Sequence, residues 1–307
     1  MESLNWLLPL AVLLAAVYVL GFALFVAVSL RPPRVPVYLS PTSLRMPQED
    51  VTFTTDDGIK LRAWWVDQPE SDAVAILCHG YVMNRCEWLP TALDLHELGL
   101  SCLLFDFRAH GGSGGKKTHL AVREWRDVQA AVRYARSRKP GARIVLIGSS
   151  MGAAACALAL AQDRALADAV VLDSAYSRLD RSMVAWCRLL GGKTLAFLAR
   201  PFLALSGVFL GRHARTVDVA QALAENGGTP TLILHGDRDR LAAPDEAHRN
   251  RAALNGSGDL VWFEGCGHSE GRLMQPERYR QVLARFLIEH GMGAERKSEP
   301  RPDPGRP

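Results

Sequence analysis

The sequence lacks both the cysteine spacing of a metal site and the basic clusters of a nucleic-acid-binding protein. Its six cysteines are scattered without a C-x-x-C pair, and several lie within apolar stretches, which predicts buried, reduced thiols in a reducing compartment. The formal net charge of +4 is small for 307 residues, and no dense group of lysines and arginines is interleaved with aromatic residues. We therefore expect no metal site and no nucleic-acid partner.

Charged residues are also absent from Ser3 to Leu30, where the chain becomes almost continuously apolar. A helix with Pro9 at its first position that runs to Leu30 would be about 33 Å long, close to the hydrocarbon thickness of a bilayer. We therefore expect residues 1–30 to be a single transmembrane anchor. A cleaved signal peptide is the alternative, but no basic side chain precedes the apolar run, and the run is long for a signal peptide.

Three arginines follow this span closely, whereas the only charged side chain before it is that of Glu2. The arginines are Arg31, Arg34 and Arg45. By the positive-inside rule, this asymmetry predicts a single-pass membrane protein in which the domain after the span lies in the cytoplasm. Residues 31–50 contain five prolines, a composition that opposes helix and sheet and predicts a stiff, extended spacer.

Apolar, β-prone runs alternate with helical patterns across residues 51–290. We expect eight strands, near residues 51–54, 59–66, 74–78, 100–105, 143–147, 169–172, 231–234 and 260–263. Asp56-Asp57-Gly58 predicts a hairpin between the first two strands. Helical stretches are expected near 87–98, 121–138, 151–162, 219–225, 244–254 and 276–290. This order predicts an α/β domain with an eight-stranded, mostly parallel sheet covered by helices on both faces. The polar tail, residues 291–307, is expected to be disordered.

Residues 177–216 form one irregular insertion, between the sixth and seventh predicted strands. This insertion combines large apolar side chains with seven basic residues and a single acidic residue, Asp180. We expect a helical lid over the active site, with a composition suited to an anionic lipid surface. The alternative is an ordinary cover over the sheet edge with a solvated basic rim.

The stretch from Arg143 to Gly152, R-I-V-L-I-G-S-S-M-G, carries the strongest chemical signal. An apolar strand runs into G-x-S-x-G, and an alanine-rich helical pattern follows. This arrangement is typical of a nucleophile elbow, in which a sharp turn lifts the hydroxyl of the central serine, Ser150, clear of the sheet. Ser149 is its neighbour. An ordinary tight turn is the alternative interpretation.

A serine nucleophile needs a base, and the base needs a group that orients it. The seventh and eighth predicted strands, near 231–234 and 260–263, are followed by His235-Gly236-Asp237-Arg238-Asp239 and by a loop that reaches Gly267-His268. Both loops lie at carboxyl ends of strands, at the same sheet edge as Ser150. Besides Asp239, Asp237 and the more distant Asp245 are candidates for the acid.

These motifs, taken together, resemble those of α/β-hydrolase-fold serine hydrolases, close to the monoacylglycerol lipase and serine aminopeptidase group. The matching pieces, spread over roughly Val51 to His290, are His79-Gly80-Tyr81, Asp106 to Ser113, the elbow, His235 to Asp239, and Gly267-His268. The resemblance implies Ser150 as nucleophile, Asp239 as acid and His268 as base. It also implies an oxyanion hole from the backbone N–H groups of Tyr81 and Met151, with no metal or organic cofactor. Ala109 stands where the family usually has glycine.

The sequence thus predicts a membrane-anchored serine hydrolase that cleaves carboxylic esters, lipid-like ones in particular, through an acyl-enzyme. A peptidase, thioesterase or acyltransferase would share this chemistry and differ in pocket and acceptor. A catalytically silent scaffold on the same fold is the alternative from another class, and the intact Ser-His-Asp set argues against it. The glycines between residues 111 and 115 suggest a phosphate loop only weakly, because no G-K-[ST] follows them.

Overall fold

A computed structural model describes residues 6–256 and 258–293 and contains one eight-stranded sheet. The strands are β1 (Glu49–Thr54), β2 (Lys60–Val66), β3 (Ala73–Cys78), β4 (Ser101–Phe105), β5 (Arg143–Ser149), β6 (Ala169–Asp173), β7 (Thr231–Gly236) and β8 (Gly258–Phe263). Their order across the sheet is β1-β2-β4-β3-β5-β6-β7-β8. All eight predicted strands are present, and their ends differ from the predicted ends by at most two residues.

The sheet is parallel except around β2. This strand pairs antiparallel with β1 and also with β4, whereas β4, β3, β5, β6, β7 and β8 run parallel to one another. Every residue of β3, β4, β6 and β7 is buried, as parallel strands covered on both faces require. Gly58 supplies the positive φ, 81°, of the turn that joins β1 to β2.

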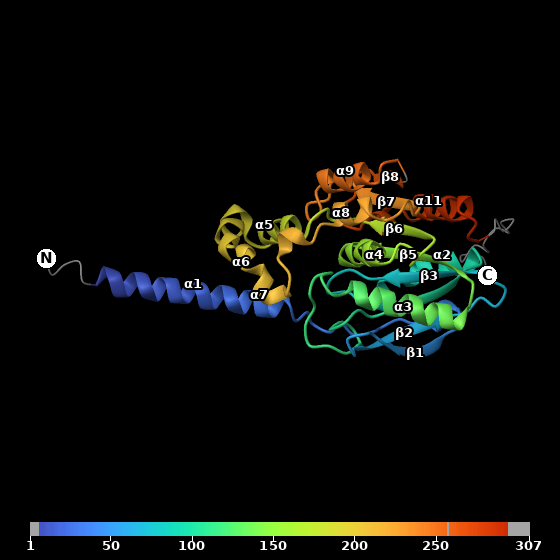
Figure 1. Ribbon diagram of the computed structural model, residues 1–307, viewed down its shortest axis with the longest axis horizontal. Coiled ribbons are helices and arrows are strands. Elements are labelled where there is room, and N and C mark those ends of the chain that lie inside the picture. Colours follow the sequence, from blue (N-terminus) through green and yellow to red (C-terminus); the bar gives the residue numbers. More distant parts are fainter. Residues whose placement is uncertain (1–5, 257, 294–307) are drawn as a thin grey trace, which may run out of the picture.

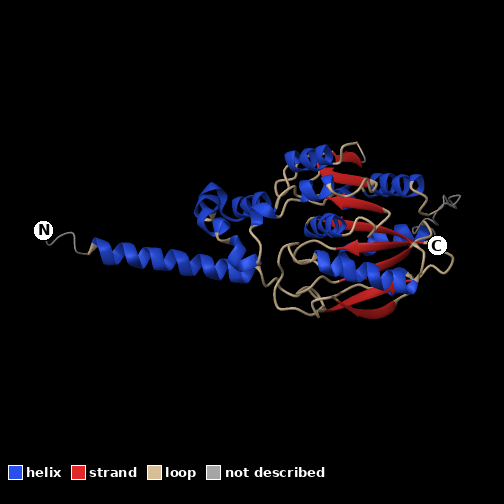
Figure 2. Cartoon of the chain, viewed as in Figure 1, coloured by secondary structure: helices blue, strands red, loops and turns tan. Residues whose placement is uncertain are grey.

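Helices cover both faces of the sheet, as Figure 2 shows. Their bounds are α2 (Leu89–Glu97), α3 (Trp125–Arg138), α4 (Met151–Gln162), α8 (Val219–Ala224), α9 (Pro244–Ala253), α10 (Gly271–Met274) and α11 (Pro276–Glu289). Buried side chains of α3, α4, α8 and α9 form one core cluster, and those of α2 and α11 form another. Both clusters include side chains of the central strands, so the sheet separates two apolar cores.

The N-terminal helix α1 (Leu7–Ser29) projects away from the sheet domain (Figure 1). It is long and apolar enough to cross a membrane, with a mean hydropathy of 2.7 in its most apolar part, and only 6% of that part is buried. A core helix of a soluble domain would be mostly buried, so the low burial argues against that interpretation.

The segment after α1, predicted to be a stiff extended spacer, has no helix or strand from residue 32 to residue 40 and contacts the sheet domain. Residues Pro41–Leu44 form a short 3₁₀ helix, η2, which begins with proline at its first position, where no N–H is needed. The Arg34 guanidinium donates to carbonyl oxygens of the 110–115 loop, including 2.6 Å to Ser113 and 2.9 Å to Gly115. Pro41 and Met46 are buried. This segment therefore packs along the domain.

The insertion, residues 177–216, is helical and lies alongside the domain-proximal half of α1 (Figure 1). It comprises α5 (Leu179–Leu198), α6 (Arg200–Ala204), α7 (Ser206–Leu210) and the 3₁₀ helix η4 (Ala214–Thr216). Non-helical backbone at Gly191 and Gly192 divides α5 into two parts. Two of its basic residues are paired with acids, Arg178 with Asp180 and Arg181 with Glu246.

The cysteines and the C-terminal segment complete the comparison with the sequence. All six cysteines are free and buried, as predicted. The first residues of the predicted tail are packed, because Met292 is fully buried and Arg143 donates to the carbonyl oxygens of His290 and Gly291. The rest of the tail, from residue 294, lies outside the described residues.

Candidate active site

Ser150 occupies a sharp turn between β5 and α4, with φ of 52° and ψ of −111°, a strained conformation for a residue with a side chain. The two glycines of G-x-S-x-G make this turn possible. A Cβ on Gly148 would lie 2.6 Å from the Ala153 nitrogen, and a Cβ on Gly152 would lie 2.2 Å from the Cys78 carbonyl oxygen. The backbone at this elbow is therefore packed too closely for larger residues. Ser150 is partly exposed, whereas Ser149 is buried.

The structure brings the three predicted triad side chains together. His268 Nε2 lies 2.8 Å from Ser150 Oγ, and His268 Nδ1 lies 2.7 Å from Asp239 Oδ2. Asp239 is buried, and its other oxygen accepts 2.8 Å hydrogen bonds from the backbone N–H groups of Leu241 and Ala242. These partners assign the proton of the neutral imidazole to Nδ1, which leaves Nε2 as acceptor for the serine hydroxyl.

The other candidate acids do not reach the imidazole in this way. Asp237 is exposed, and its Oδ1 accepts a 2.7 Å hydrogen bond from the Gly265 backbone N–H. Asp245 is exposed in the first turn of α9. The geometry thus favours Asp239 for the position of the acid, because its carboxylate is fixed by two backbone donors and faces His268.

Three further histidines, His79, His110 and His235, are buried in the loops around the site. His79 donates through Nδ1 to the Gly80 carbonyl oxygen, and its Nε2 accepts the Phe107 backbone N–H at 2.9 Å. Burial lowers the pKa of His79 and of His235, and it lowers the pKa of His110 to about 3. These imidazoles are therefore neutral at physiological pH and connect backbone segments.

Tyr81 and Met151, the predicted oxyanion donors, line the same cavity as Ser150. Met151 is the first residue of α4, so its N–H has no partner within that helix. Among the described residues, neither N–H donates to another protein group. Two unused donors beside the serine hydroxyl suit an oxyanion, and the N-terminus of α4 adds a favourable dipole.

A buried ion cluster, formed by Glu87, Asp173 and Arg272, lies next to the elbow and was not predicted from the sequence. Arg272 pairs with Glu87 and lies 3.2 Å from Asp173 Oδ2. The second Glu87 oxygen accepts the Gly80 backbone N–H at 2.6 Å. Burial raises the pKa of Asp173, and the Arg272 charge opposes this shift. The cluster thus holds the loop that carries Tyr81. Asp173 could have been noticed as the end of a buried strand, whereas Arg272 belongs to no motif.

The loop after β4 is built from internal contacts. Asp106 accepts the backbone N–H groups of Arg85 and Gly112 at 2.9 and 2.8 Å. Ala109 adopts a positive φ of 63°, so alanine occupies the left-handed conformation that glycine would favour. The carbonyl oxygens of this loop face Arg34, an arrangement unsuited to binding phosphate.

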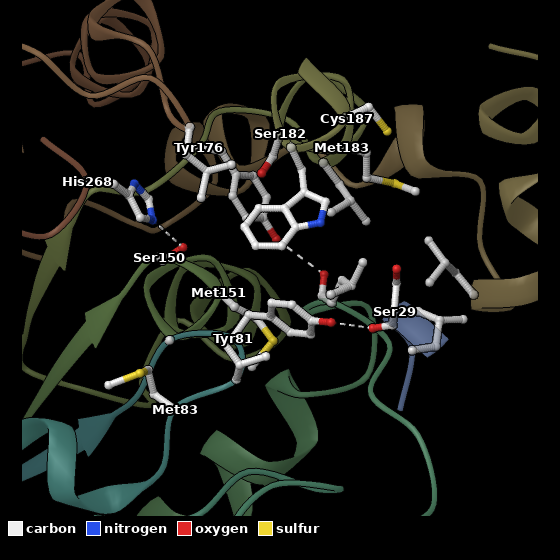
Figure 3. Close-up of a pocket in the computed structure, with 18 of the residues that line it drawn as sticks. Ser29, Tyr81, Met83, Ser150, Met151, Tyr176, Ser182, Met183, Cys187 and His268 are labelled. Carbon is white, nitrogen blue, oxygen red and sulfur yellow. Dashed lines mark hydrogen bonds between the residues drawn. The ribbon is translucent and has the colours of Figure 1, made fainter. Parts of the chain in front are cut away.

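An apolar cavity of about 370 Å³ connects Ser150 and His268 to α1 and the insertion (Figure 3). Figure 3 shows Tyr81 between the catalytic pair and Ser29, with Tyr176, Ser182 and Met183 along another side. Among the described residues, no group of three or more His, Cys, Asp or Glu side chains could hold a metal ion. The geometry therefore places the Ser150, His268 and Asp239 side chains, with the candidate oxyanion donors Tyr81 and Met151, beside an apolar chamber.

The chain is similar in structure to a known esterase. Pf2001, an esterase of Pyrococcus furiosus, matches with a TM-score of 0.72 and 28% sequence identity, over 85% of this chain and 98% of that protein. Residues 69–207 match the family model Hydrolase_4, described as serine aminopeptidase, S33. That match includes Tyr81 and Ser150 and ends before Asp239 and His268.

Relatives of similar length match in sequence. An uncharacterized protein of Mycobacterium tuberculosis is 28% identical over 249 residues, which are 78% of this chain and 79% of that protein. The alpha/beta hydrolase domain-containing protein WAV2 of Arabidopsis thaliana is 26% identical over 298 residues, with coverage of 88% and 91%. Together with the eight-stranded sheet, these comparisons confirm the fold predicted from the sequence.

Proposed function

We propose that the chain, which has the α/β-hydrolase fold, is a membrane-anchored serine hydrolase that cleaves carboxylic esters of lipid-like molecules. One observation carries the proposal. His268 lies within hydrogen-bond distance of both Ser150 and Asp239, 2.8 and 2.7 Å respectively, at the edge of the sheet where the elbow ends β5. Nucleophile, base and acid then have the order and contacts of a catalytic triad.

The proposed reaction starts when Ser150 Oγ attacks the ester carbonyl while its proton moves to His268 Nε2. Asp239 stabilises the imidazolium and keeps its orientation, and the N–H groups of Tyr81 and Met151 receive the oxyanion. His268 then gives the proton to the leaving alkoxide. Water, deprotonated by His268, attacks the acyl-enzyme, and His268 returns this proton to Ser150 Oγ as the carboxylic acid is released.

The cavity favours an ester with a hydrocarbon portion over a peptide. Its lining is mainly apolar, and its charged members Glu87, Glu270 and Arg272 all lie in the segments around the triad. A peptidase is the second candidate, because the matching family model is described as a serine aminopeptidase. Thioester hydrolysis and acyl transfer would use the same triad with another leaving group or acceptor.

We further propose that α1 anchors the enzyme with the catalytic domain in the cytoplasm. The support is the uncharged apolar helix and the basic residues that follow it. A protease-protection assay on sealed cells, with an epitope at the C-terminus, tests this orientation. Protection of the epitope until the membrane is opened is expected, and digestion of the epitope in intact cells would contradict it.

The activity is tested with matched ester and amide substrates. Purified full-length protein is given the 4-nitrophenyl ester and the 4-nitroanilide of the same acyl group, beside the Ser150→Ala variant. We expect ester hydrolysis that is lost in the variant, and much slower release from the anilide. Efficient cleavage of aminoacyl anilides with poor ester turnover would favour the peptidase, and no turnover of either substrate would contradict the proposal.

A further inference from the structure

The anchor helix α1 lines the cavity that contains Ser150. Its C-terminal end contributes Phe22, Phe25, Val26 and Ser29, and Leu30 follows directly after the helix. The insertion contributes other lining side chains, among them Met183, Trp186, Phe202 and Phe209. The chamber beside the triad is therefore enclosed partly by the segment that the sequence assigns only to membrane anchoring.

The contact between α1 and the insertion is specific and apolar. The rings of Phe22 and Phe202 stack with centroids 4.0 Å apart, and the Tyr18 ring packs edge-on against Phe202 at 5.5 Å. The Tyr18 hydroxyl donates a 2.5 Å hydrogen bond to the Leu198 carbonyl oxygen. Phe22, Cys187, Ala196 and Ala199 form a small buried cluster between the two segments. The contact fixes the relative positions of the two walls.

The contact also fixes where the cavity would lie in a membrane. The part of α1 from Tyr18 to Ser29 is about 18 Å long. The part before Tyr18 is only about 16 Å long, which is shorter than the roughly 30 Å hydrocarbon layer of a bilayer. If α1 spans the bilayer, the insertion therefore enters the nearer leaflet. Its exposed apolar side chains suit that position: Leu189, Leu190, Phe197, Leu198, Leu205 and Val208.

We propose that the space between α1 and the insertion is the acyl-chain site of the enzyme, with Val26 at its wall, and that it receives long-chain esters sideways from the leaflet. This inference rests on the proposed ester hydrolase function. In the bound complex, the ester carbonyl lies at Ser150, and the hydrocarbon chain runs along Val26 and Phe22 toward Phe202. Because α1 borders both the lipid and the cavity, a chain reaches the site without crossing water.

A pair of matched substitutions on α1 tests the site. Val26 lines the cavity and is partly buried, whereas Leu24, two residues earlier, is 65% exposed and does not line it. Val26→Trp would fill the acyl-chain site, and Leu24→Trp adds the same ring to the outer face of α1. Each full-length variant, in detergent micelles of one composition, is assayed with 4-nitrophenyl esters from two to sixteen carbons.

We expect Val26→Trp to lower the kcat/KM ratio of the dodecanoate to the acetate ester by at least tenfold, while Leu24→Trp keeps the wild-type ratio within about twofold. Unchanged ratios in both variants, with active wild-type enzyme, would overturn the acyl-chain site and leave the hydrolase proposal standing. An equal fall in both variants would mean that the ring disturbs α1 as a whole, and it would also overturn the proposed site.

A binding measurement separates failure of the site from failure of the chemistry. Binding of radiolabelled palmitate is measured for Ser150→Ala protein in phosphatidylcholine nanodiscs, and empty nanodiscs give the non-specific signal. The same measurement is made after Val26→Trp or Leu24→Trp has been added to Ser150→Ala. Saturable binding that Val26→Trp weakens at least tenfold would support the site even if no ester is hydrolysed. Absence of saturable binding, or equal binding in both backgrounds, would contradict it whatever the turnover.

Discussion

The Tyr81 hydroxyl donates a 2.5 Å hydrogen bond to the carbonyl oxygen of Ser29, the last residue of α1. Tyr81 belongs to the loop after β3, and its backbone N–H is a proposed oxyanion donor. A single residue thus connects the end of the proposed membrane anchor to the proposed oxyanion hole. Removal of α1 would break this hydrogen bond and also take away part of the cavity wall.

Tyr81→Phe removes the hydrogen bond to Ser29 and keeps the ring and the backbone N–H. We expect a loss of about 1 kcal/mol of stability, visible as a lower melting temperature, and a higher KM for long-chain esters. The kcat for a short ester should fall by less than about tenfold, because the oxyanion donor is still present. A kcat loss above a hundredfold on the short ester would show that the phenol takes part in the chemistry.

Asp239→Asn should lower kcat by a factor on the order of 10³ to 10⁴, with the fold intact by circular dichroism. Asp239 Oδ1 accepts two backbone N–H groups, so the amide of asparagine would keep its oxygen there and present its NH₂ to His268. Nδ1 would then have to be the unprotonated nitrogen, and Nε2 could no longer accept the serine proton.

Asp237→Asn is the control, because its amide oxygen can still accept the Gly265 N–H, and we expect less than about a fivefold change. The reverse result, with the larger loss in Asp237→Asn, would mean that the wrong acid has been assigned.

Ala109→Gly should raise the melting temperature. Ala109 is buried with φ of 63°, and an L-residue in this region costs roughly 1 to 2 kcal/mol. Glycine removes that strain, but it also makes the unfolded chain more flexible, which offsets part of the gain. The free energy of unfolding should therefore rise by about 1 kcal/mol or less. Ala109→Val, which is β-branched, should destabilise strongly. A lower melting temperature for the glycine variant would contradict the strained turn.

His110 makes stability depend on pH. Burial, with the nearby His79 and Arg34, lowers the pKa of His110 from 6.5 to about 3. Between these two pH values the His110 imidazole is therefore protonated in the unfolded chain and neutral in the folded one. The contribution of His110 to the free energy of unfolding is complete above pH 6.5. It declines as the pH falls toward 3, by up to about 1.4 kcal/mol per pH unit.

We therefore expect the melting temperature of His110→Asn to fall less between pH 7.5 and 5.5 than that of the wild type. Parallel curves for the two proteins would show that His110 is not held neutral in the folded state.

Much of the sheet could be predicted because its residues carry local signals. The buried runs of β3, β5 and β6 are apolar with turn residues at their ends, and the hairpin has Asp57-Gly58 at its turn. The elbow could be located from Gly148, Ser150 and Gly152, since each glycine is required by a close backbone contact. The strand order and the antiparallel pairing of β2 with β4 depend on long-range packing, and no local pattern encodes them.

The parts that sequence analysis missed depend on contacts between distant residues. Proline content suggested an extended segment after α1, but the Arg34 contacts and the burial of Met46 dock it on the domain. Glu87 and Arg272 are 185 residues apart and meet only in the fold. Likewise, the apolar composition of α1 indicates a membrane span, yet nothing in it signals that Val26 borders the cavity.

The central claim is that Ser150 is the nucleophile, and covalent labelling tests it most directly. The protein is treated with an alkyl fluorophosphonate, which phosphonylates activated serines, and is digested with trypsin. The peptide from Ile144 to Arg164 contains both Ser149 and Ser150. We predict that this peptide carries the phosphonyl adduct in the wild type and in Ser149→Ala, where ester turnover stays within about tenfold, and carries none in Ser150→Ala. An adduct on this peptide in Ser150→Ala, or none in the wild type, would contradict the account.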